Sequence, residues 1–151
     1  MTTTDEQQII AFETAGQRFA VHLRHVLEVQ PLGNMSPVPC TPSFIVGVVN
    51  LRGNLHAVVD LGAFFGLPPV NRTATSRVLL TRASDLEVGI LADQVFHVAE
   101  LHPDNLELPL ALQQGIPREY VRGIVREPSA LLLDLDRLFL DPRLIVDEEI
   151  G

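Results

Sequence analysis

Two parts of the chain repeat the same series of apolar and turn residues. The segment FAVHLRHVLEV (Phe19–Val29) aligns without a gap with VGILADQVFHV (Val88–Val98). A second segment, GVVNLRGNLHAVVDLGAFF (Gly47–Phe65), aligns with GIVREPSALLLDLDRLF (Gly123–Phe139), which is two residues shorter in the turn between its apolar runs. Because repeats of this kind arise from duplicated structural units, the chain is predicted to fold into two similar halves.

The apolar runs are short, rich in Val, Ile and Leu, and mostly bounded by Gly, Pro, Asn or Asp, which is typical of strands. We predict strands at Ile9–Thr14, Arg18–His22, Phe44–Leu51, Leu55–Asp60, Arg77–Thr81, Glu87–Leu91, His97–Leu101, Tyr120–Arg126 and Ala130–Asp134. Short helices are predicted at Leu23–Val29, Leu61–Phe65, Ala92–Phe96 and Leu135–Leu140. The expected fold class is therefore all-β with short helices.

The repeated halves, approximately residues 19–75 and 88–140, are each too small to bury much apolar surface alone. They should pack against each other through a shared apolar seam, and closing each sheet removes its exposed edges. We expect the whole chain of 151 residues to form one domain of two small, intertwined β-barrels related by a pseudo-twofold axis. The acidic tail, residues 141–151, is expected to fray.

Charge, hydropathy and cysteine content limit the partners and the location expected for the chain. With 11 Lys and Arg against 19 Asp and Glu, the net charge is -8, which disfavours nucleic acids and anionic membrane surfaces. No apolar run reaches the length of a membrane span, and the polar N-terminus does not resemble a secretory signal. The single cysteine, Cys40, excludes a disulfide framework. A cytoplasmic location is the simplest expectation.

No motif in the chain predicts catalysis, a cofactor or a metal. A nucleophilic role for Cys40 needs a histidine partner that the sequence does not identify. His22 and His25 could share a helix face, but a metal site needs a third ligand. Asp60 and Asp134 occupy equivalent places in the two copies, each between a strand and a helix, so both are predicted helix N-caps.

Arg52 stands at the hairpin turn of the first copy, within NLRGN. The neighbouring Gly53-Asn54 pair could form a tight turn alone, and the second copy turns without an equivalent of Arg52-Gly53. Folding therefore does not require this arginine. Strand alternation places Arg52 on the face opposite Val49 and Leu51, so it should point outward if those two are buried.

Glu28 is a possible partner for Arg52, because a guanidinium matches a carboxylate in bidentate geometry. Glu28 aligns with His97 in the second copy, so the fold does not demand a carboxylate there. On a free surface such a pair would contribute only about 0–1 kcal/mol, whereas in an interface it can decide partner choice. A solvated turn arginine and an interface arginine both remain open.

The segment FIVGVVNLRGNLHAVVDL resembles the signature of CheW-like chemotaxis coupling proteins. The similarity extends to FAVHLRHVLEVQP, LEVGILADQV and YVRGIVREPSALLLDLDRLF, and so covers most of the chain. The resemblance implies two five-stranded, SH3-like barrels around a common apolar core, and no enzymatic activity. It also implies binding to the cytoplasmic tip of chemoreceptors and to the regulatory domain of the histidine kinase CheA.

Five positions match residues tied to these contacts in the family. The arginine of N-L-R-G falls on Arg52 and the glutamate of V-x-E on Glu28. The resemblance also assigns receptor-coupling positions to Val26, Val78 and Gly89. The family often has proline before V-V-D-L, where this chain has Ala57.

The sequence is compatible with three functions. The first is an adaptor that couples chemoreceptors to a CheA-type kinase, in flagellar chemotaxis, a type IV pilus system or another chemosensory array. The second is a small-molecule sensor or protein-binding module that uses the groove between the barrels. The third is a hydrolase that uses His22, His25 or Cys40.

Overall fold

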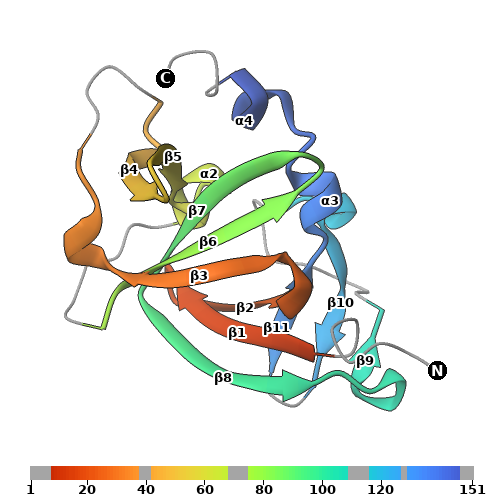
Figure 1. Ribbon diagram of the computed structural model, residues 1–151. Coiled ribbons are helices and arrows are strands. Elements are labelled where there is room, and N and C mark those ends of the chain that lie inside the picture. The colour runs from red at the N-terminus through yellow and green to blue at the C-terminus, as the bar shows by residue number, and fades with distance from the viewer. Residues whose placement is uncertain (1–7, 38–41, 68–74, 109–115, 127–128, 147–151) are drawn as a thin grey trace.

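A computed structural model describes residues 8–37, 42–67, 75–108, 116–126 and 129–146, which form two strongly curled β-sheets (Figure 1). The five-stranded sheet has the order β3-β6-β7-β5-β4. Its strands are β3 (Val26–Pro31), β4 (Ile45–Leu51), β5 (Asn54–Val59), β6 (Arg77–Ala83) and β7 (Leu86–Ala92). The predicted all-β class with two small barrels is confirmed by this arrangement.

The second sheet has six strands in the order β8-β1-β2-β11-β10-β9. Its strands are β1 (Gln8–Thr14), β2 (Gln17–His22), β8 (Gln94–Glu100), β9 (Leu106–Glu107), β10 (Val121–Val125) and β11 (Ala130–Leu133). This sheet is therefore built from both ends of the described chain, while the five-stranded sheet is built from its middle.

Short helices connect or follow the strands. They are the 3-10 turns η1 (Leu23–His25), η2 (Leu32–Asn34), η3 (Pro103–Asn105) and η4 (Arg118–Tyr120), and the α-helices α2 (Leu61–Phe64), α3 (Leu135–Leu138) and α4 (Pro142–Val146). Among the described residues, none of the helices has the length and hydropathy needed to cross a bilayer.

The internal repeat is visible in the strand register. In each sheet one parallel pair joins a hairpin to the next, with Val58 opposite Gly89 in the five-stranded sheet and Leu132 opposite Ala20 in the six-stranded sheet. The alignment equates these two pairs of residues. Each copy also crosses from one sheet to the other, since β2 is followed by β3, and β7 by β8. The two repeats are therefore interlocked, and each supplies strands to both sheets.

The predicted N-caps are confirmed at both equivalent positions. The Asp60 carboxylate accepts a hydrogen bond from the backbone N–H of Ala63 at 3.3 Å, at the start of α2. The Asp134 carboxylate accepts one from the N–H of Arg137 at 3.1 Å, at the start of α3. Each cap satisfies a backbone donor that a helix of four residues cannot satisfy internally.

A shared apolar core lies between the sheets and holds the two repeats together. Its largest cluster draws buried residues from both sheets and from the end of α3, among them Phe12, Phe19, Val59, Ile90, Leu133 and Phe139. Two smaller clusters gather Val49, Val58, Val78, Leu80 and Leu91 from the five-stranded sheet, and Ile9, Ala20, Val125, Ala130 and Leu132 from the six-stranded sheet. The predicted shared seam is thus the main hydrophobic core.

Two predicted helices are wrong. Only Leu23–His25 of the predicted helix Leu23–Val29 is helical, and the chain continues as strand β3. The predicted helix Ala92–Phe96 is largely the start of strand β8. Apolar residues at these spacings fit both a helix and a strand, and edge pairing with β6 and with β1 decides in favour of the strand. The tail begins with a packed helix, α4, rather than fraying from residue 141.

Candidate functional site

Arg52 occupies the tip of the β4–β5 hairpin. Leu51 pairs with Asn54, so Arg52 and Gly53 alone form the turn. Their φ angles are 54° and 88°, which is the left-handed geometry of a type I′ hairpin turn. The Asn50 side chain stabilises the turn by accepting a hydrogen bond from the Gly53 N–H at 3.0 Å. Arg52 is exposed, as predicted, but it lies in the turn itself rather than on a strand face.

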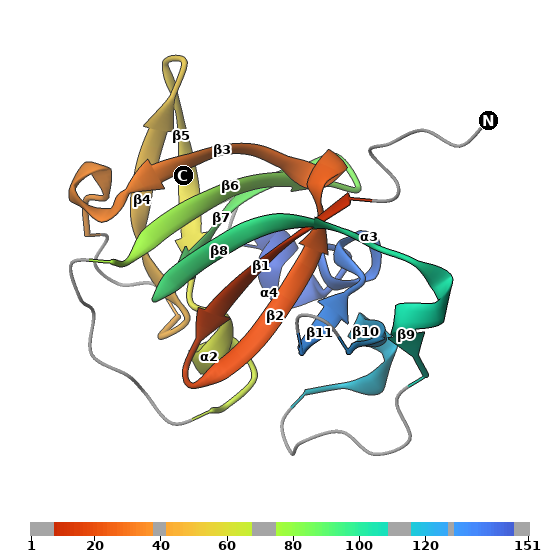
Figure 2. The same ribbon diagram turned by 90° about the horizontal axis from the view of Figure 1, so that it is seen from below.

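The first hairpin is longer than its counterpart in the second repeat. The pair Val49–His56 is equivalent to Val125–Ala130, which is the last pair before the turn in the second copy. The first copy adds two further pairs, so its tip projects beyond the rest of the five-stranded sheet (Figure 2). The two additional residues of the first copy therefore present Arg52 on a protruding ribbon.

Glu28 lies on β3, the edge strand of the same sheet, and is exposed. A β-bulge between Val26 and Glu28 breaks the simple alternation of buried and exposed residues. As a result three successive residues face solvent, and Leu27 and Val29 retain 45% and 40% of their surface exposed. An edge strand with this apolar exposure is suited to contact another protein.

Arg52 and Glu28 form no direct ion pair among the described residues. The Glu28 carboxylate instead accepts a hydrogen bond from the Gln30 side-chain amide at 2.8 Å. The same amide nitrogen lies 3.4 Å from the backbone carbonyl of Asn50, at the base of the Arg52 turn. The two predicted site residues are thus linked through Gln30, which sequence reasoning did not single out.

A surface groove of about 280 Å³ runs beside Arg52. Its lining residues are Leu27, Leu51, Arg52, Asn54, His56, Arg82 and Glu87. Glu87 lies 3.6 Å from the His56 ring and 3.8 Å from the Arg82 guanidinium, so this carboxylate lies between an imidazole and a guanidinium. The groove combines an apolar wall with a cationic rim, in a chain whose net charge is -8.

The other three predicted site residues are placed inside the fold. Val78 is completely buried within the five-stranded barrel, and Val26 is half-buried against the main core. A Cβ added at Gly89 would lie 2.8 Å from Val78 Cγ1 and 3.2 Å from Val58 Cγ2. Gly89 therefore permits close packing of β7 against its neighbours. Val78 and Gly89 therefore determine the packing inside the barrel and present no side chain on its surface.

Of the three candidate catalytic residues, the structure describes His22 and His25. The rings of His22 and His25 are 6.4 Å apart and both side chains are buried. His25 Nδ1 lies 2.9 Å from the Arg82 carbonyl, and its Nε2 lies 3.8 Å from Asp136, so this histidine links β6 to α3. Within the described segments no three His, Cys, Asp or Glu residues are placed to hold a metal. Cys40 lies outside the described residues.

Helix α4 packs on the junction of the sheets through a polar cluster that the sequence did not predict. The Tyr120 hydroxyl donates a hydrogen bond to Asp141 at 2.6 Å, and Arg143 pairs with Asp141 at 3.1 Å. The Arg143 guanidinium also lies 3.8 Å from the centre of the Phe64 ring. Tyr120 belongs to the second repeat and Phe64 to the first, so the cluster joins both to α4.

The pKa values of Tyr120 and Asp141 reflect this packing. Burial, with the hydrogen bond to Asp141, raises the pKa of Tyr120 to about 12. Burial alone would raise the pKa of Asp141, but hydrogen bonds from Arg143 and Tyr120 lower it overall. Asp141 is therefore held as a carboxylate at neutral pH, where it fixes the start of α4.

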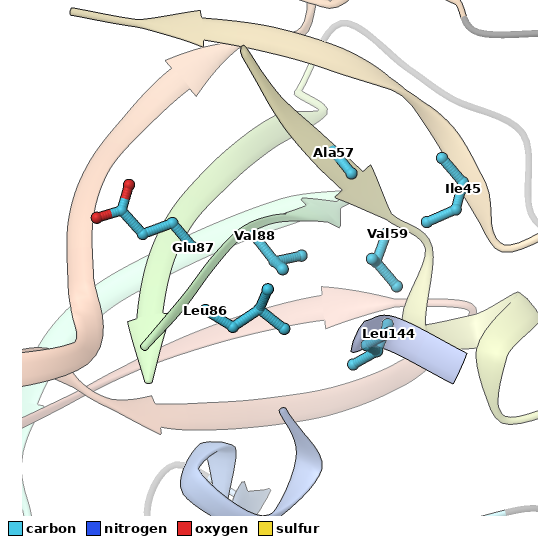
Figure 3. Close-up of a pocket in the computed structure, with 7 residues that line it drawn as sticks. All are labelled: Ile45, Ala57, Val59, Leu86, Glu87, Val88 and Leu144. Atoms are coloured by element: carbon cyan, nitrogen blue, oxygen red, sulfur yellow. The ribbon is translucent and has the colours of Figure 1, made fainter. Parts of the chain in front are cut away.

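Leu144 of α4 is buried, and it closes a small pocket at the mouth of the five-stranded barrel (Figure 3). The other lining residues are Ile45, Ala57, Val59, Leu86, Glu87 and Val88. The remaining volume is about 30 Å³, room for no more than about two water molecules. This pocket does not favour the small-molecule-sensor hypothesis.

The paired barrels carry a protruding hairpin with an exposed arginine and an edge strand with exposed apolar residues. Residues 8–143 match the family model described as a CheW-like domain. The chain therefore belongs to the CheW-like family.

Individual relatives are similar over most of their length. "Protein FrzA" of Myxococcus xanthus is 30% identical over 121 residues, which is 80% of this chain and 75% of that protein. The "Chemotaxis protein CheW" of Treponema pallidum is 26% identical over 146 residues, covering 92% of this chain and 86% of the relative. The crystal structure of the scaffolding protein TtCheW from Thermoanaerobacter tengcongensis superposes with a TM-score of 0.76 at 26% identity, covering 89% and 88% of the two chains.

Proposed function

We propose that this chain is a non-enzymatic adaptor that couples chemoreceptors to a CheA-type histidine kinase, in the cytoplasm. The observation that carries the proposal is the CheW-like domain over residues 8–143, in a chain similar to proteins named for chemotaxis and to one described as a scaffolding protein. An adaptor needs binding surfaces rather than a reaction centre. The projecting hairpin and the exposed β3 edge are such surfaces.

The Arg52 hairpin and Glu28 form the proposed charged contact. Arg52 is exposed on a two-residue turn, and the groove beside it has an apolar wall at Leu27. A cation beside desolvated apolar surface can select a partner strongly once water is excluded. The regulatory domain of the kinase is the partner proposed for this end of the barrel.

The receptor tip is proposed to use apolar residues on the two equivalent edge strands. Val29 on β3 and Val98 on β8 occupy matching places in the two repeats, and 40% and 45% of their surfaces are exposed. Val78 and Gly89 would then affect receptor binding indirectly, because their packing fixes the position of β6, and β6 pairs with β3.

Titration calorimetry with a CheA-type regulatory domain and with a receptor cytoplasmic fragment tests this proposal. Arg52→Ala should weaken kinase binding, and Glu28→Ala should weaken binding to at least one of the partners, while both variants keep the wild-type melting temperature. Ser129→Ala, at an exposed position in the turn of the second repeat, is the matched control and should bind normally. Unchanged affinities in both site variants would contradict the assignment. A melting temperature raised by a small metabolite, without partner binding, would favour the sensor function instead.

A further inference from the structure

The five-stranded barrel has a seam where two strands do not pair. Strands β3 and β4 lie at opposite ends of the sheet order, so the barrel must close by other contacts. Ser36 exchanges two backbone hydrogen bonds with Val48 of β4, at 2.8 and 2.7 Å. Asn50 lies two residues further along β4, and its carbonyl therefore faces the same edge. It accepts a hydrogen bond from the Gln30 side chain of β3 at 3.4 Å. Gln30 thus closes the seam at the hairpin end.

Gln30 also holds the exposed carboxylate of the edge strand. Its Nε2 donates to Glu28 Oε2 at 2.8 Å, in addition to the contact with Asn50. Asn50 in turn accepts the Gly53 N–H that shapes the Arg52 turn. One side-chain amide is therefore connected to both charged residues of the proposed site, directly to Glu28 and through Asn50 to Arg52.

Burying the Gln30 amide is unfavourable for folding, so stability alone does not explain a glutamine at this position. Gln30 is only 5% exposed, and its Oε1 atom is buried without a hydrogen-bond partner. The opposite orientation of the amide would place that oxygen against the Glu28 carboxylate, so the carboxylate fixes the orientation. A buried acceptor without a partner loses its hydration without compensation, whereas an apolar side chain of similar size does not.

The second repeat shows that the fold does not need an amide at this place. Continuing the first alignment by one residue puts Ala99 at the position of Gln30, and the second alignment puts Arg126 at the position of Asn50. There the backbone N–H of Arg126 donates to the Asn105 carbonyl at 2.9 Å. The Arg126 guanidinium also donates to the Asp104 carbonyl, so the corresponding edge of the six-stranded sheet is held without a side-chain amide.

We propose that Gln30 is a positioning residue for partner binding, which holds the Glu28 carboxylate and the Arg52 turn in a fixed relation. The naming of the partner rests on the function proposed above. The positioning itself is a property of the free protein, so it can be tested separately.

The test compares Gln30→Met with Val125→Ala, a control whose side chain is fully buried in the other sheet. Three quantities are measured: the melting temperature, the NMR signal of the Gly53 amide, and the affinity for the kinase regulatory domain. Gln30→Met should melt at or above the wild-type temperature, shift and broaden the Gly53 signal, and bind about tenfold more weakly. Val125→Ala should melt earlier while the Gly53 signal and the affinity stay unchanged.

Wild-type affinity in Gln30→Met would overturn the inference. So would a loss of affinity that accompanies an equal loss of stability in both variants. If the wild-type chain binds neither kinase nor receptor, the proposed function fails. The Gly53 signal then decides the positioning alone, and an unaltered signal in Gln30→Met overturns it.

Discussion

Replacing Arg52 with asparagine is expected to stabilise the protein and to weaken kinase binding. Arg52 and Gly53 both have positive φ angles, at 54° and 88°. A type I′ turn strongly prefers Asn-Gly at these positions, because asparagine tolerates the left-handed region better than other residues with a Cβ. Arginine is therefore less favourable than asparagine for the local turn conformation at position 52.

The size of the effect follows from the geometry. A residue such as arginine costs about 1–2 kcal/mol in the left-handed region, and asparagine recovers part of this through its local hydrogen bonds. Arg52 is exposed and has no ion pair within the described residues, so little is lost on its removal. We expect a gain of about 0.5–1 kcal/mol in the free energy of unfolding, which raises the melting temperature by about 1–4 °C.

Binding should change in the opposite direction. A buried interface arginine contributes about 2 kcal/mol or more, so the affinity for the kinase regulatory domain should fall about thirtyfold. Differential scanning calorimetry and titration calorimetry on the same preparation measure both quantities. Arg52→Lys is the control, because it keeps the charge and the turn strain. A variant Arg52→Asn that is less stable than wild type, or that binds equally well, would refute the reasoning.

Three further predictions concern the packing that supports the site. Gly89→Ala should lower the free energy of unfolding in urea by about 1–3 kcal/mol, since its Cβ would lie 2.8 Å from Val78, and an unchanged transition would contradict this close approach. Leu144→Ala should cost about 2 kcal/mol or more and speed hydrogen exchange in α4, and slow exchange there would show that the helix docks without Leu144. Because the folded pKa of Asp141 is lowered, its contribution is complete above the ordinary aspartate pKa and is lost as pH falls through the folded value. Stability measured against pH should therefore decline less steeply below pH of about 4 in Asp141→Asn, and an identical slope would be inconsistent with this role.

The repeat made the paired architecture predictable from sequence. The alignment correctly matched Asp60 with Asp134 as caps, and the parallel pairs Val58–Gly89 and Leu132–Ala20 follow its register. The alignment does not predict which strands of each copy belong to which sheet. Strand order depends on contacts between residues far apart in the chain, and local apolar spacing carries no information about them.

The errors have a common physical origin. The predicted helix Leu23–Val29 includes Val26–Val29, which instead belongs to an edge strand paired with β6. Its pairing and bulge are decided by the partner strand, so tertiary contacts override the local pattern. For the same reason the strand alternation placed Arg52 on a strand face, whereas the two-residue turn places it at the tip.

Within the candidate site, the exposure of the charged residues was easier to predict from the sequence than the contacts that link them. Arg52 and Glu28 are both exposed, in agreement with the sequence argument. Their link through Gln30 and Asn50 depends on the barrel seam, which joins strands that are distant in sequence. The α4 cluster was missed because its tyrosine lies 21 residues before the aspartate it contacts.

Simultaneous binding of two partners tests the adaptor function most directly. The chain is mixed with a CheA-type regulatory domain and a receptor cytoplasmic fragment, and the masses of the complexes are measured by size-exclusion chromatography with light scattering. The adaptor function predicts a ternary complex with wild-type protein, and only the receptor complex with Arg52→Ala. Mutually exclusive binding of the two partners, or no complex with either, would contradict it.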